Sequence, residues 1–222
     1  MAENNQTDLV SKITSLCKRR GIIFQNSEIY GGVQGFYDYG PIGSQMKMNW
    51  KNIWWQENVV KRRDVVGIDG SIITHPRVWE ASGHVKNFAD VMVECKKCHK
   101  RYRPDLLDDP TKCPECGGSF TEGRKYNILF ETEIGVIEGE KLHAYLRGEA
   151  CQTIYLDFKN IVDSTRVKIP FGIAQIGKAF RNEITPKNFL YRTREFEQWD
   201  IQYFVHPSEM DKWFEYWKEN RI

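Results

Sequence analysis

The clearest pattern of hydrophobic and polar positions lies in residues 172–205, GIAQIGKAFRNEITPKNFLYRTREFEQWDIQYFV. A period of two, which is the side-chain period of a β-strand, runs through residues 173–183 and again through residues 192–202. The stretch therefore predicts two strands joined by a charged loop. One surface of the pair is expected to present five side chains together: Arg181, Glu183, Arg192, Phe196 and Asp200.

Helical spacing dominates the first sixty residues. Apolar positions predict a short helix over residues 7–20, and Gly21 is a suitable residue to end it. Residues 25–40 are rich in Gly and Tyr, which predicts turns and a short hairpin or loop. Pro41 can open the next helix, whose apolar residues follow helical spacing: Ile42, Met46, Trp50, Ile53, Trp54 and Val60.

The rest of the chain divides into shorter elements. The segment VVGIDGSIITHPRVW predicts a strand ending at Pro76, and residues 153–165 predict a helix. Residues 94–124 form a cysteine-bearing unit with its own turn residues. The end of the chain, SEMDKWFEYWKENRI, predicts a helix capped by Ser208 and cut soon after its start. Its apolar residues need a surface to pack on: Met210, Trp213, Phe214 and Trp217.

Composition restricts the class of protein. A chain of 222 residues accommodates one large or two small domains, and 41% hydrophobic residues suffice for a packed core. The formal net charge of +2 gives no strong electrostatic case for nucleic acid, so RNA binding would depend on a local patch. No apolar run approaches the length of a membrane span, and the N-terminal MAENNQTDLV lacks a signal-peptide apolar region. We therefore expect a cytoplasmic protein with no membrane partner.

Four of the six cysteines form two CxxC pairs. Each CxxC places two thiolates on one tight turn, and two such turns close a four-sulfur site with no open coordination position, which suits a structural Zn²⁺. In a chain without a secretory signal, paired CxxC indicates a metal before a disulfide. The expected metal ligands are Cys95, Cys98, Cys113 and Cys116.

Basic residues surround these cysteines, and two interpretations stay open. The unit could serve only to stabilise the fold, since runs of charge are usually just solvated. Alternatively, the basic residues could contact RNA: Lys96, Lys97, Lys100, Arg101, Arg103 and Lys112.

The shared face of the two C-terminal strands carries side chains suited to a nucleotide and a small amine. Arg181 can hold a phosphate with two hydrogen bonds, Glu183 can accept hydrogen bonds from an exocyclic amine, and Phe196 can stack on a base. Charges on exposed strands often pair only with each other across the sheet. The joint pattern, with the long charged loop between the strands, favours a ligand site.

The segment FRNEITPKNFLYRTREFEQWDIQYF resembles motif 2 of class II aminoacyl-tRNA synthetases, and within that class the dimeric glycyl-tRNA synthetases. The helix from Pro41 and the strand ending at Pro76 resemble motif 1, which builds the dimer interface in the family. The four-cysteine unit resembles the family's zinc-bearing insertion. Further segments resemble the family in the same order: LCKRRGIIFQNSEIYGG, GFYDYGPIG, WEASGH and DFKNIVDSTRVKIPFGIAQIGKAFRNE.

The resemblance implies an α+β fold, namely a class II aminoacyl-tRNA synthetase-type antiparallel sheet flanked by helices, with an inserted four-cysteine zinc ribbon. Residues 1–93 would form the first part of the catalytic domain with motif 1, residues 94–124 the zinc-ribbon insertion, and residues 125–222 the continuation with motif 2. Motif 3 and the anticodon-binding domain of the family find no match, so an N-terminal catalytic portion is expected.

Roles follow from the resemblance residue by residue. Arg181 would bind the α-phosphate of ATP and stabilise the charge that develops there, and Glu183 would contact the adenine amino group; these are the two expected catalytic residues. Arg192 would reach the γ-phosphate, and Phe196 would stack on adenine. The glycine-binding residues would be Arg147, Glu149, Gln152 and Asp200.

The implied reaction is ATP-dependent activation of glycine to glycyl-adenylate, with Mg²⁺ accompanying ATP, and transfer of glycine to tRNA(Gly). The implied partners are tRNA(Gly), glycine, ATP and a second copy of the chain bound through motif 1. The implied cofactor is a structural Zn²⁺.

The glycine-binding segment departs from the family's usual RPETAQG. It reads RGEACQT, so that Gly148 replaces proline and Thr153 replaces glycine, and Asp200 stands where the family has glutamate. Cys151 within the segment is expected to be buried rather than reactive. These changes indicate altered substrate handling or relaxed constraint. The alternative function is therefore a non-catalytic, truncated synthetase paralogue that binds nucleotide or RNA, and a plain zinc-ribbon RNA-binding module is a third, less favoured reading.

Overall fold

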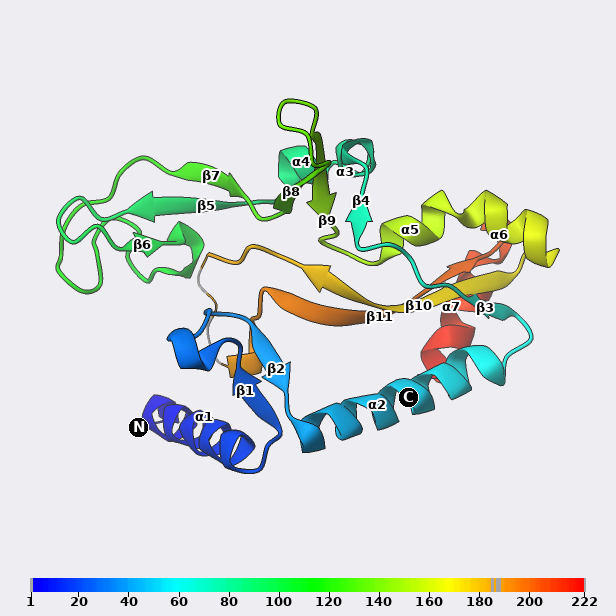
Figure 1. The fold of residues 1–222 in the computed structure, drawn as a ribbon, viewed down its shortest axis with the longest axis horizontal. Coiled ribbons are helices and arrows are strands. Elements are labelled where there is room, and N and C mark those ends of the chain that lie inside the picture. The colour runs from blue at the N-terminus through cyan, green and yellow to red at the C-terminus, as the bar shows by residue number, and fades with distance from the viewer. Residues whose placement is uncertain (1, 185, 187–188, 222) are drawn as a thin grey trace. The chain divides into compact units, whose positions relative to one another are not determined.

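The computed structural model describes residues 2–184, 186 and 189–221. The chain forms two compact units (Figure 1). The first comprises residues 1–72 and 149–222, and the second comprises residues 73–148. The second unit contains the cysteine-bearing residues together with the elements that flank them. The division into residues 1–93, 94–124 and 125–222 stays a prediction.

The first unit is organised around a three-stranded sheet with the order β11-β10-β3. β10 (Phe171–Phe180) and β11 (Glu195–Phe204) pair antiparallel along their full ten residues, and β3 (Val65–Gly67) joins β10 in parallel. The predicted pair of strands is thus confirmed. The register sets Gln175 opposite Asp200, which places these two residues on the same face of the sheet.

Both strands are shorter at the loop end than the polarity pattern predicted. They stop before Arg181, Glu183 and Arg192, which lie in the connection between the strands. The ladder continues by one hydrogen bond, from the Arg181 N–H to the Arg194 carbonyl over 3.0 Å. Beyond it the Glu183 N–H donates to the Arg181 carbonyl over 2.6 Å, and this local turn ends the extended conformation.

Helices cover both faces of this sheet (Figure 1). On one face, α5 (Cys151–Leu156) and α6 (Phe158–Thr165) enclose a core with β10. The predicted single helix over residues 153–165 is therefore wrong in its continuity, because the backbone of Asp157, with φ −90° and ψ 1°, departs from the helical conformation and separates α5 from α6. On the other face lies α2 (Pro41–Trp55), which begins at the predicted proline. The buried core residues are Ile154, Ile161, Phe171 and Ile173.

The N-terminal elements follow the predicted order. α1 (Ala2–Arg19) ends before Gly21, whose φ of 63° lies in the left-handed region that glycine tolerates best. The predicted hairpin is formed by β1 and β2, which pair antiparallel. Between α1 and β3, the chain also forms β1 (Ile23–Gln25), η1 (Glu28–Tyr30), β2 (Tyr37–Tyr39) and, after α2, η2 (Gln56–Val60).

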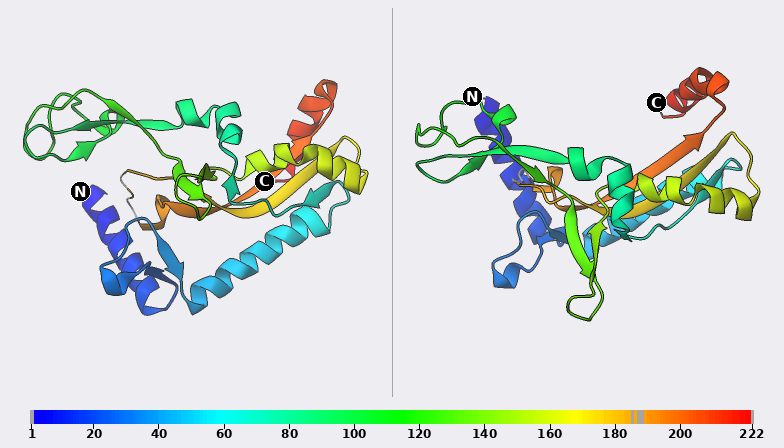
Figure 2. Two further views of the ribbon diagram at one scale, coloured as in Figure 1. Left: turned by 45° about the horizontal axis from the view of Figure 1, so that its top comes forward. Right: turned by 90° about the horizontal axis from the view of Figure 1, so that it is seen from above.

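The C-terminal helix α7 (Met210–Glu219) follows a short turn, η5 (Pro207–Glu209), beyond the end of β11 (Figure 2). The predicted Ser208 cap is wrong, because the His206 ring accepts the Ser208 N–H over 3.3 Å and the α-helix starts later. Trp213 and Trp217 pack on Tyr203, with ring centroids 5.3 and 5.1 Å apart. The two tryptophan rings therefore have the packing surface that the sequence predicted they would need, whereas Met210 and Phe214 stay exposed.

The second unit contains a sheet of order β4-β9-β8 and two short helices. The predicted strand ending at Pro76 is wrong, because its residues form β3 of the first unit and the separate strand β4, and Pro76 begins a helix. The His75 ring accepts the Arg77 N–H over 3.2 Å and so caps that helix. Trp79, Leu129 and Tyr145 form the core. The elements are β4 (Ile73–Thr74), α3 (Pro76–Ala81), α4 (His84–Asn87), β8 (Phe130–Ile134) and β9 (Leu142–Leu146).

The cysteine-bearing part of the second unit is built on a sheet of order β6-β5-β7. Its elements are β5 (Ala89–Glu94), β6 (Arg101–Tyr102), η3 (Pro104–Leu106) and β7 (Arg124–Asn127). Across residues 2–184, 186 and 189–221, no helix combines the length and apolar character needed to cross a membrane.

Candidate functional site

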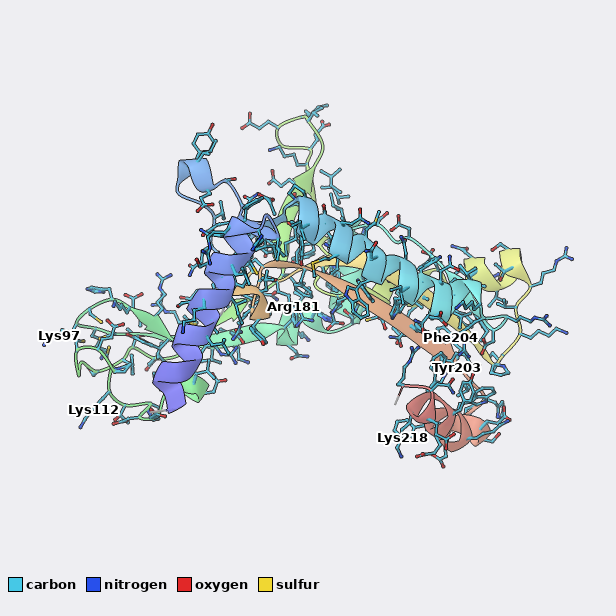
Figure 3. The ribbon with its side chains drawn as sticks, turned by 90° about the horizontal axis from the view of Figure 1, so that it is seen from below. Lys97, Lys112, Arg181, Tyr203, Phe204 and Lys218 are labelled. Carbon is cyan, nitrogen blue, oxygen red and sulfur yellow. The ribbon has the colours of Figure 1, made fainter. Side chains whose placement is uncertain are left out.

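Arg181 stands at the centre of the candidate site, at the loop end of β10 and β11 (Figure 3). Its guanidinium carbon lies 5.4 Å from the centre of the Phe196 ring, within cation–π distance. Its Nη2 lies 3.7 Å from Oε1 of Glu149. The arginine and glutamate side chains are each about 30% exposed, so solvent reaches both. Three side chains predicted for the site, from two halves of the first unit, are therefore brought together.

Glu183 and Arg192 form a second group in the connection between the strands. Arg192 Nε donates to Glu183 Oε2 over 2.6 Å, and Nη2 of the same guanidinium lies 2.5 Å from that oxygen. The Glu183 side chain is buried, and a buried carboxylate requires such a charged partner. Arg194 Nε donates to the Glu183 carbonyl over 2.9 Å, which fastens the backbone of the connection.

Glu149 is held by two neighbouring side chains near the start of α5. Gln152 Nε2 donates to Glu149 Oε2 over 3.1 Å, and the Cys151 thiol lies 3.4 Å from the same oxygen. Burial, followed by the hydrogen bond and negative charge of Glu149, raises the pKa of the Cys151 thiol to about 12. The thiol is thus an uncharged hydrogen-bond donor at neutral pH. Cys151 is only half-buried, so the expectation of burial is met in part, and its low reactivity stays a prediction.

The start of α5 is tied to the sheet by a buried glutamine that the sequence did not single out. Gln175 Nε2 donates to the Ala150 carbonyl and, over 3.0 Å, to Thr153 Oγ1. From β11, Gln198 Oε1 accepts the Ala150 N–H over 2.8 Å. These amides hold the backbone beside Glu149 in place. A polar residue at an inward position of β10 was the available signal, because a fully buried glutamine must find partners.

Asp200 lies on the same sheet face as Gln175 and is half-buried. Gln202 Nε2 donates to both of its carboxylate oxygens, over 3.0 and 3.2 Å, and Tyr155 Oη donates to Gln202 Oε1 over 2.7 Å. Asp200 is therefore oriented by neighbours along its own strand. Arg147 is almost completely buried, at 2% exposure, within the second unit.

Two glycines explain how the altered segment fits. A Cβ at Gly148 would lie 2.9 Å from Leu129 Cδ2, and Leu129 is part of the core, so a proline at this position would require the Leu129 side chain to shift. A Cβ at Gly70 would lie 2.5 Å from Thr153 Oγ1. The threonine that replaces the family's glycine thus occupies space that Gly70 leaves open.

The opposite face of β11 carries a charged group that the sequence analysis missed. Lys47 and Lys51 of α2 place Nζ atoms 3.1 and 3.0 Å from Glu197 Oε1, and the carboxylate is only 12% exposed. The group borders a cavity of about 620 Å³ on this side of β11. Lysines four apart on one helix face were the available signal. Because Glu197 follows Phe196 directly, this group fixes the part of β11 that carries the Phe196 ring.

The four predicted metal ligands converge in the second unit. Their Sγ atoms all lie within 4.8 Å of one another, with Cys95 and Cys116 at 3.4 Å and Cys98 and Cys113 at 3.7 Å. A tetrahedral Zn²⁺ with four thiolates places its sulfurs about 3.8 Å apart. Gly118 permits the approach, since a Cβ there would lie 3.0 Å from Cys95 Sγ. The donor set and its spacing therefore suit a metal ion with four sulfur ligands.

The basic residues beside the cysteines are partly committed to internal ion pairs. Lys100 pairs with Glu115, Arg101 with Glu94, and Arg103 with Asp90 and Asp105. These pairs favour the stabilising interpretation for those three residues. Three lysines stay exposed, and Figure 3 shows two of them on the loops of the unit: Lys96, Lys97 and Lys112.

Comparison with known proteins identifies related chains. Residues 130–222 match the family described as tRNA synthetase class II core domain (G, H, P, S and T). The chain is 54% identical to the glycine–tRNA ligase of Treponema denticola over 216 residues, which cover 96% of this chain and 48% of that protein. It is 51% identical to the glycine–tRNA ligase of Borreliella burgdorferi over 212 residues, covering 95% and 48%. The chain thus spans about half the length of these relatives.

The fold also resembles a solved structure. The RNA binding domain of threonyl-tRNA synthetase from Cryptosporidium parvum superposes with a TM-score of 0.58 at 18% identity, covering 89% of this chain and 38% of that chain. At this identity the likeness concerns the fold alone. The fold is that of a class II tRNA synthetase, with mixed α and β content and antiparallel sheets.

Proposed function

The chain belongs to the glycine–tRNA ligases, a class II tRNA synthetase family, and on this basis we propose that it acts in the ATP-dependent ligation of glycine to tRNA(Gly). Glycine would first be activated to glycyl-adenylate and then transferred to the tRNA. This is a step of protein biosynthesis, which points to the cytoplasm as the location of the protein.

The observation that carries the proposal is the position of Arg181 between Phe196 and Glu149. A base stacked on the Phe196 ring leaves the α-phosphate of its nucleotide within reach of the neighbouring guanidinium. A carboxylate on the other side of that guanidinium suits the ammonium group of an amino acid. One arginine thus adjoins both substrates of an adenylation reaction.

The reaction requires no protein nucleophile. A glycine carboxylate oxygen would attack the α-phosphorus of ATP, forming the new P–O bond while the bond to the β-phosphate bridging oxygen breaks and pyrophosphate leaves. Arg181 would stabilise the negative charge that grows on the α-phosphate oxygens. Mg²⁺ bound to ATP would neutralise further phosphate charge. Arg192 and Glu183 would hold the γ-phosphate and the adenine amino group, so that catalysis rests on positioning.

The amino-acid side would select glycine by charge and by lack of space. Glu149 and Asp200 supply carboxylates for the α-ammonium group, and Gln152 orients Glu149 through their hydrogen bond. The uncharged Cys151 thiol occupies space beside Glu149 without adding charge.

The cysteine cluster is proposed to hold a structural Zn²⁺ in a zinc ribbon. Cys95, Cys98, Cys113 and Cys116 would supply all four ligands, which leaves no position for a substrate. When bound, the metal supplies cross-linking of two turns rather than chemistry. Metal analysis of the purified protein is expected to find one equivalent of zinc, and Cys113→Ser is expected to lose it. Zinc-free protein under metal-replete conditions would refute the assignment.

A homodimer through α2 is part of the proposal. The helix leaves an apolar stripe in solvent, at roughly half exposure for each residue: Ile42, Met46, Trp50 and Ile53. Residues at this spacing share one helix face, and monomers rarely expose such a continuous apolar surface. Light scattering should give twice the mass of the chain, and Trp50→Glu should shift it to the monomer; a wild-type monomer at micromolar concentration would contradict the dimer.

Isothermal titration with ATP tests the nucleotide half. Arg181→Ala is expected to weaken ATP binding at least about tenfold, because it removes charge-assisted hydrogen bonds to phosphate. Arg63→Ala, which removes an exposed arginine of the same unit, is the matched control and should bind ATP normally. Unchanged affinity in Arg181→Ala would remove the argument from motif 2.

Glycine-dependent exchange of pyrophosphate into ATP tests the activation step directly. Exchange that Arg181→Ala abolishes would support the ligase function. ATP binding without exchange would instead favour the alternative, a truncated synthetase paralogue that binds nucleotide or RNA without catalysis. Absence of ATP binding would contradict the ligase function and the nucleotide-binding form of the alternative.

A further inference from the structure

Tyr102, at the end of β6, lies beside the cysteine cluster and has no role in the proposed reaction. Its hydroxyl oxygen is 3.6 Å from Cys113 Sγ and 3.2 Å from Glu115 Oε1. Its ring packs edge-on against Phe120 at a centroid distance of 5.6 Å, which holds the hydroxyl in place. One phenolic proton therefore faces two possible acceptors, a ligand sulfur and a carboxylate.

Metal binding changes which acceptor is stronger. Cysteine binds a metal as a thiolate, so no hydrogen remains on Sγ and the sulfur carries negative charge. Cys113 is only 3% exposed, so water has little access to serve as its donor. The Tyr102 O–H then becomes a side-chain hydrogen-bond donor at this sulfur, in addition to the backbone N–H groups of Glu115 and Cys116. Rotation about the phenolic C–O bond is enough to aim it, since the heavy atoms already lie at hydrogen-bond distance for sulfur.

The competing carboxylate is already satisfied. Glu115 forms an ion pair with Lys100, and the lysine supplies hydrogen bonds in place of the phenol. Glu115 is also largely exposed, so water can solvate it, whereas Cys113 is enclosed. The balance of acceptors thus favours the sulfur once it is a thiolate.

We propose that Tyr102 is a positioning residue of the metal centre, whose hydroxyl donates a hydrogen bond to the Cys113 thiolate and strengthens metal binding. The inference rests on the proposed four-thiolate zinc site and assigns it an outer partner. Such outer partners typically contribute ten- to a hundredfold to metal affinity.

Zinc affinity of the whole chain, measured by competition with a chromophoric chelator, tests the inference. Tyr102→Phe keeps the ring that packs on Phe120 and removes only the hydroxyl, so zinc affinity should fall about ten- to a hundredfold. Tyr126→Phe, at an exposed tyrosine of the same unit, is the matched control and should retain wild-type affinity. Equal zinc affinity in Tyr102→Phe and Tyr126→Phe would overturn the inference while leaving the zinc site intact. A wild-type protein without zinc would overturn the zinc site and this inference together, without bearing on ATP binding.

Cobalt substitution gives a readout that a loss of packing would not imitate. A hydrogen bond lowers the energy of the thiolate electrons, so removing it should move the sulfur-to-cobalt charge-transfer band to longer wavelength in Tyr102→Phe. Glu115→Gln weakens the competing acceptor, so its zinc affinity should equal or exceed that of the wild type. An unshifted band in Tyr102→Phe, or a tenfold loss of zinc affinity in Glu115→Gln, would overturn the inference.

Discussion

Glu183 accepts a hydrogen bond from Nε of Arg192 over 2.6 Å, and the two side chains form an ion pair with a second nitrogen 2.5 Å away. The resemblance assigns these residues to opposite ends of ATP, the adenine and the γ-phosphate. In the structure, the two side chains instead bind to each other through this hydrogen bond and ion pair. Because the Glu183 carboxylate is buried and the arginine is one-third exposed, the carboxylate is the fixed partner and sets the position of the guanidinium.

Nucleotides with different numbers of phosphate groups, AMP and ATP, can separate the two proposed roles. Arg192→Ala is expected to weaken ATP binding about tenfold more than AMP binding, because only ATP carries a γ-phosphate. Glu183→Gln is expected to weaken the binding of both AMP and ATP, because both nucleotides contain adenine. Titration calorimetry with each nucleotide checks this. An equal loss of AMP and ATP affinity in Arg192→Ala would contradict the γ-phosphate role.

The Glu197 group predicts a pH-dependent contribution to stability. Burial alone would raise the pKa of Glu197, but hydrogen bonds from Lys51 and Lys47 hold it below its ordinary value. The stabilisation is therefore fully present above the ordinary pKa of glutamate and is lost as pH falls through the lowered native pKa. Glu197→Gln should lower the free energy of unfolding by about 1–2 kcal/mol at pH 7, with a smaller difference in acid.

The exposed pair of Glu57 and Lys61 on η2 provides the control for this measurement. Glu57→Gln should change the free energy of unfolding by less than about 0.5 kcal/mol, because solvent screens an exposed ion pair. Urea titrations at pH 7 and near pH 3 measure both variants. Similar losses in the free energy of unfolding for the two variants at pH 7 would show that burial of the Glu197 ion pairs adds nothing to stability.

Gly70 and Thr153 should be energetically coupled. Gly70→Ala alone is expected to lower the free energy of unfolding by about 2 kcal/mol. The new Cβ would lie 2.5 Å from Oγ1 of Thr153, whose side chain is buried and has little room to move. Thr153→Gly, which restores the family's usual residue, removes the obstructing atoms. The double variant should therefore be about 1–2 kcal/mol more stable than the sum of the single changes predicts. Strict additivity in a double-mutant cycle would contradict the close approach.

Cys151 should resist alkylation. Burial and the carboxylate of Glu149 raise the pKa of its thiol to about 12, so little thiolate exists at pH 8. Iodoacetamide should modify Cys151 at least about tenfold more slowly than Cys17, followed peptide by peptide by mass spectrometry. Glu149→Gln should speed the reaction by removing the adjacent negative charge. A fast reaction of Cys151 in the wild type would contradict the described environment.

The local patterns predicted several elements and failed at their boundaries. The period of two identified β10 and β11, yet it ran on through Arg181 to Glu183, because side-chain polarity does not reveal where backbone pairing stops. The apolar run before Pro76 suggested one strand, whereas its two parts pair with different partners, β10 and β9. Pairing partners far away in sequence decided both outcomes.

In the candidate site, too, local sequence patterns predicted some features, and contacts between distant residues determined the others. The CxxC spacing predicted which four cysteines cluster, but the closest sulfur pairs join the two CxxC turns, which folding brought together. The residue types of motif 2 likewise predicted that Arg181 and Phe196 belong to one site, and the structure places these two side chains together. By contrast, Gln175 and Glu197 were not foreseen, since their importance comes from backbone and side chains that only folding brings beside them.

The amino-acid sequence thus determined the family, the strand pair and the identity of the four clustered cysteines, because motifs and short-range periodicity carry this information. Folding was needed to bring Arg181 between Phe196 and Glu149, to pair Glu183 with Arg192, and to place Thr153 in the space beside Gly70. Most of these contacts join residues from separate elements, and their geometry depends on strand register and helix packing. Local propensity contains no information about either.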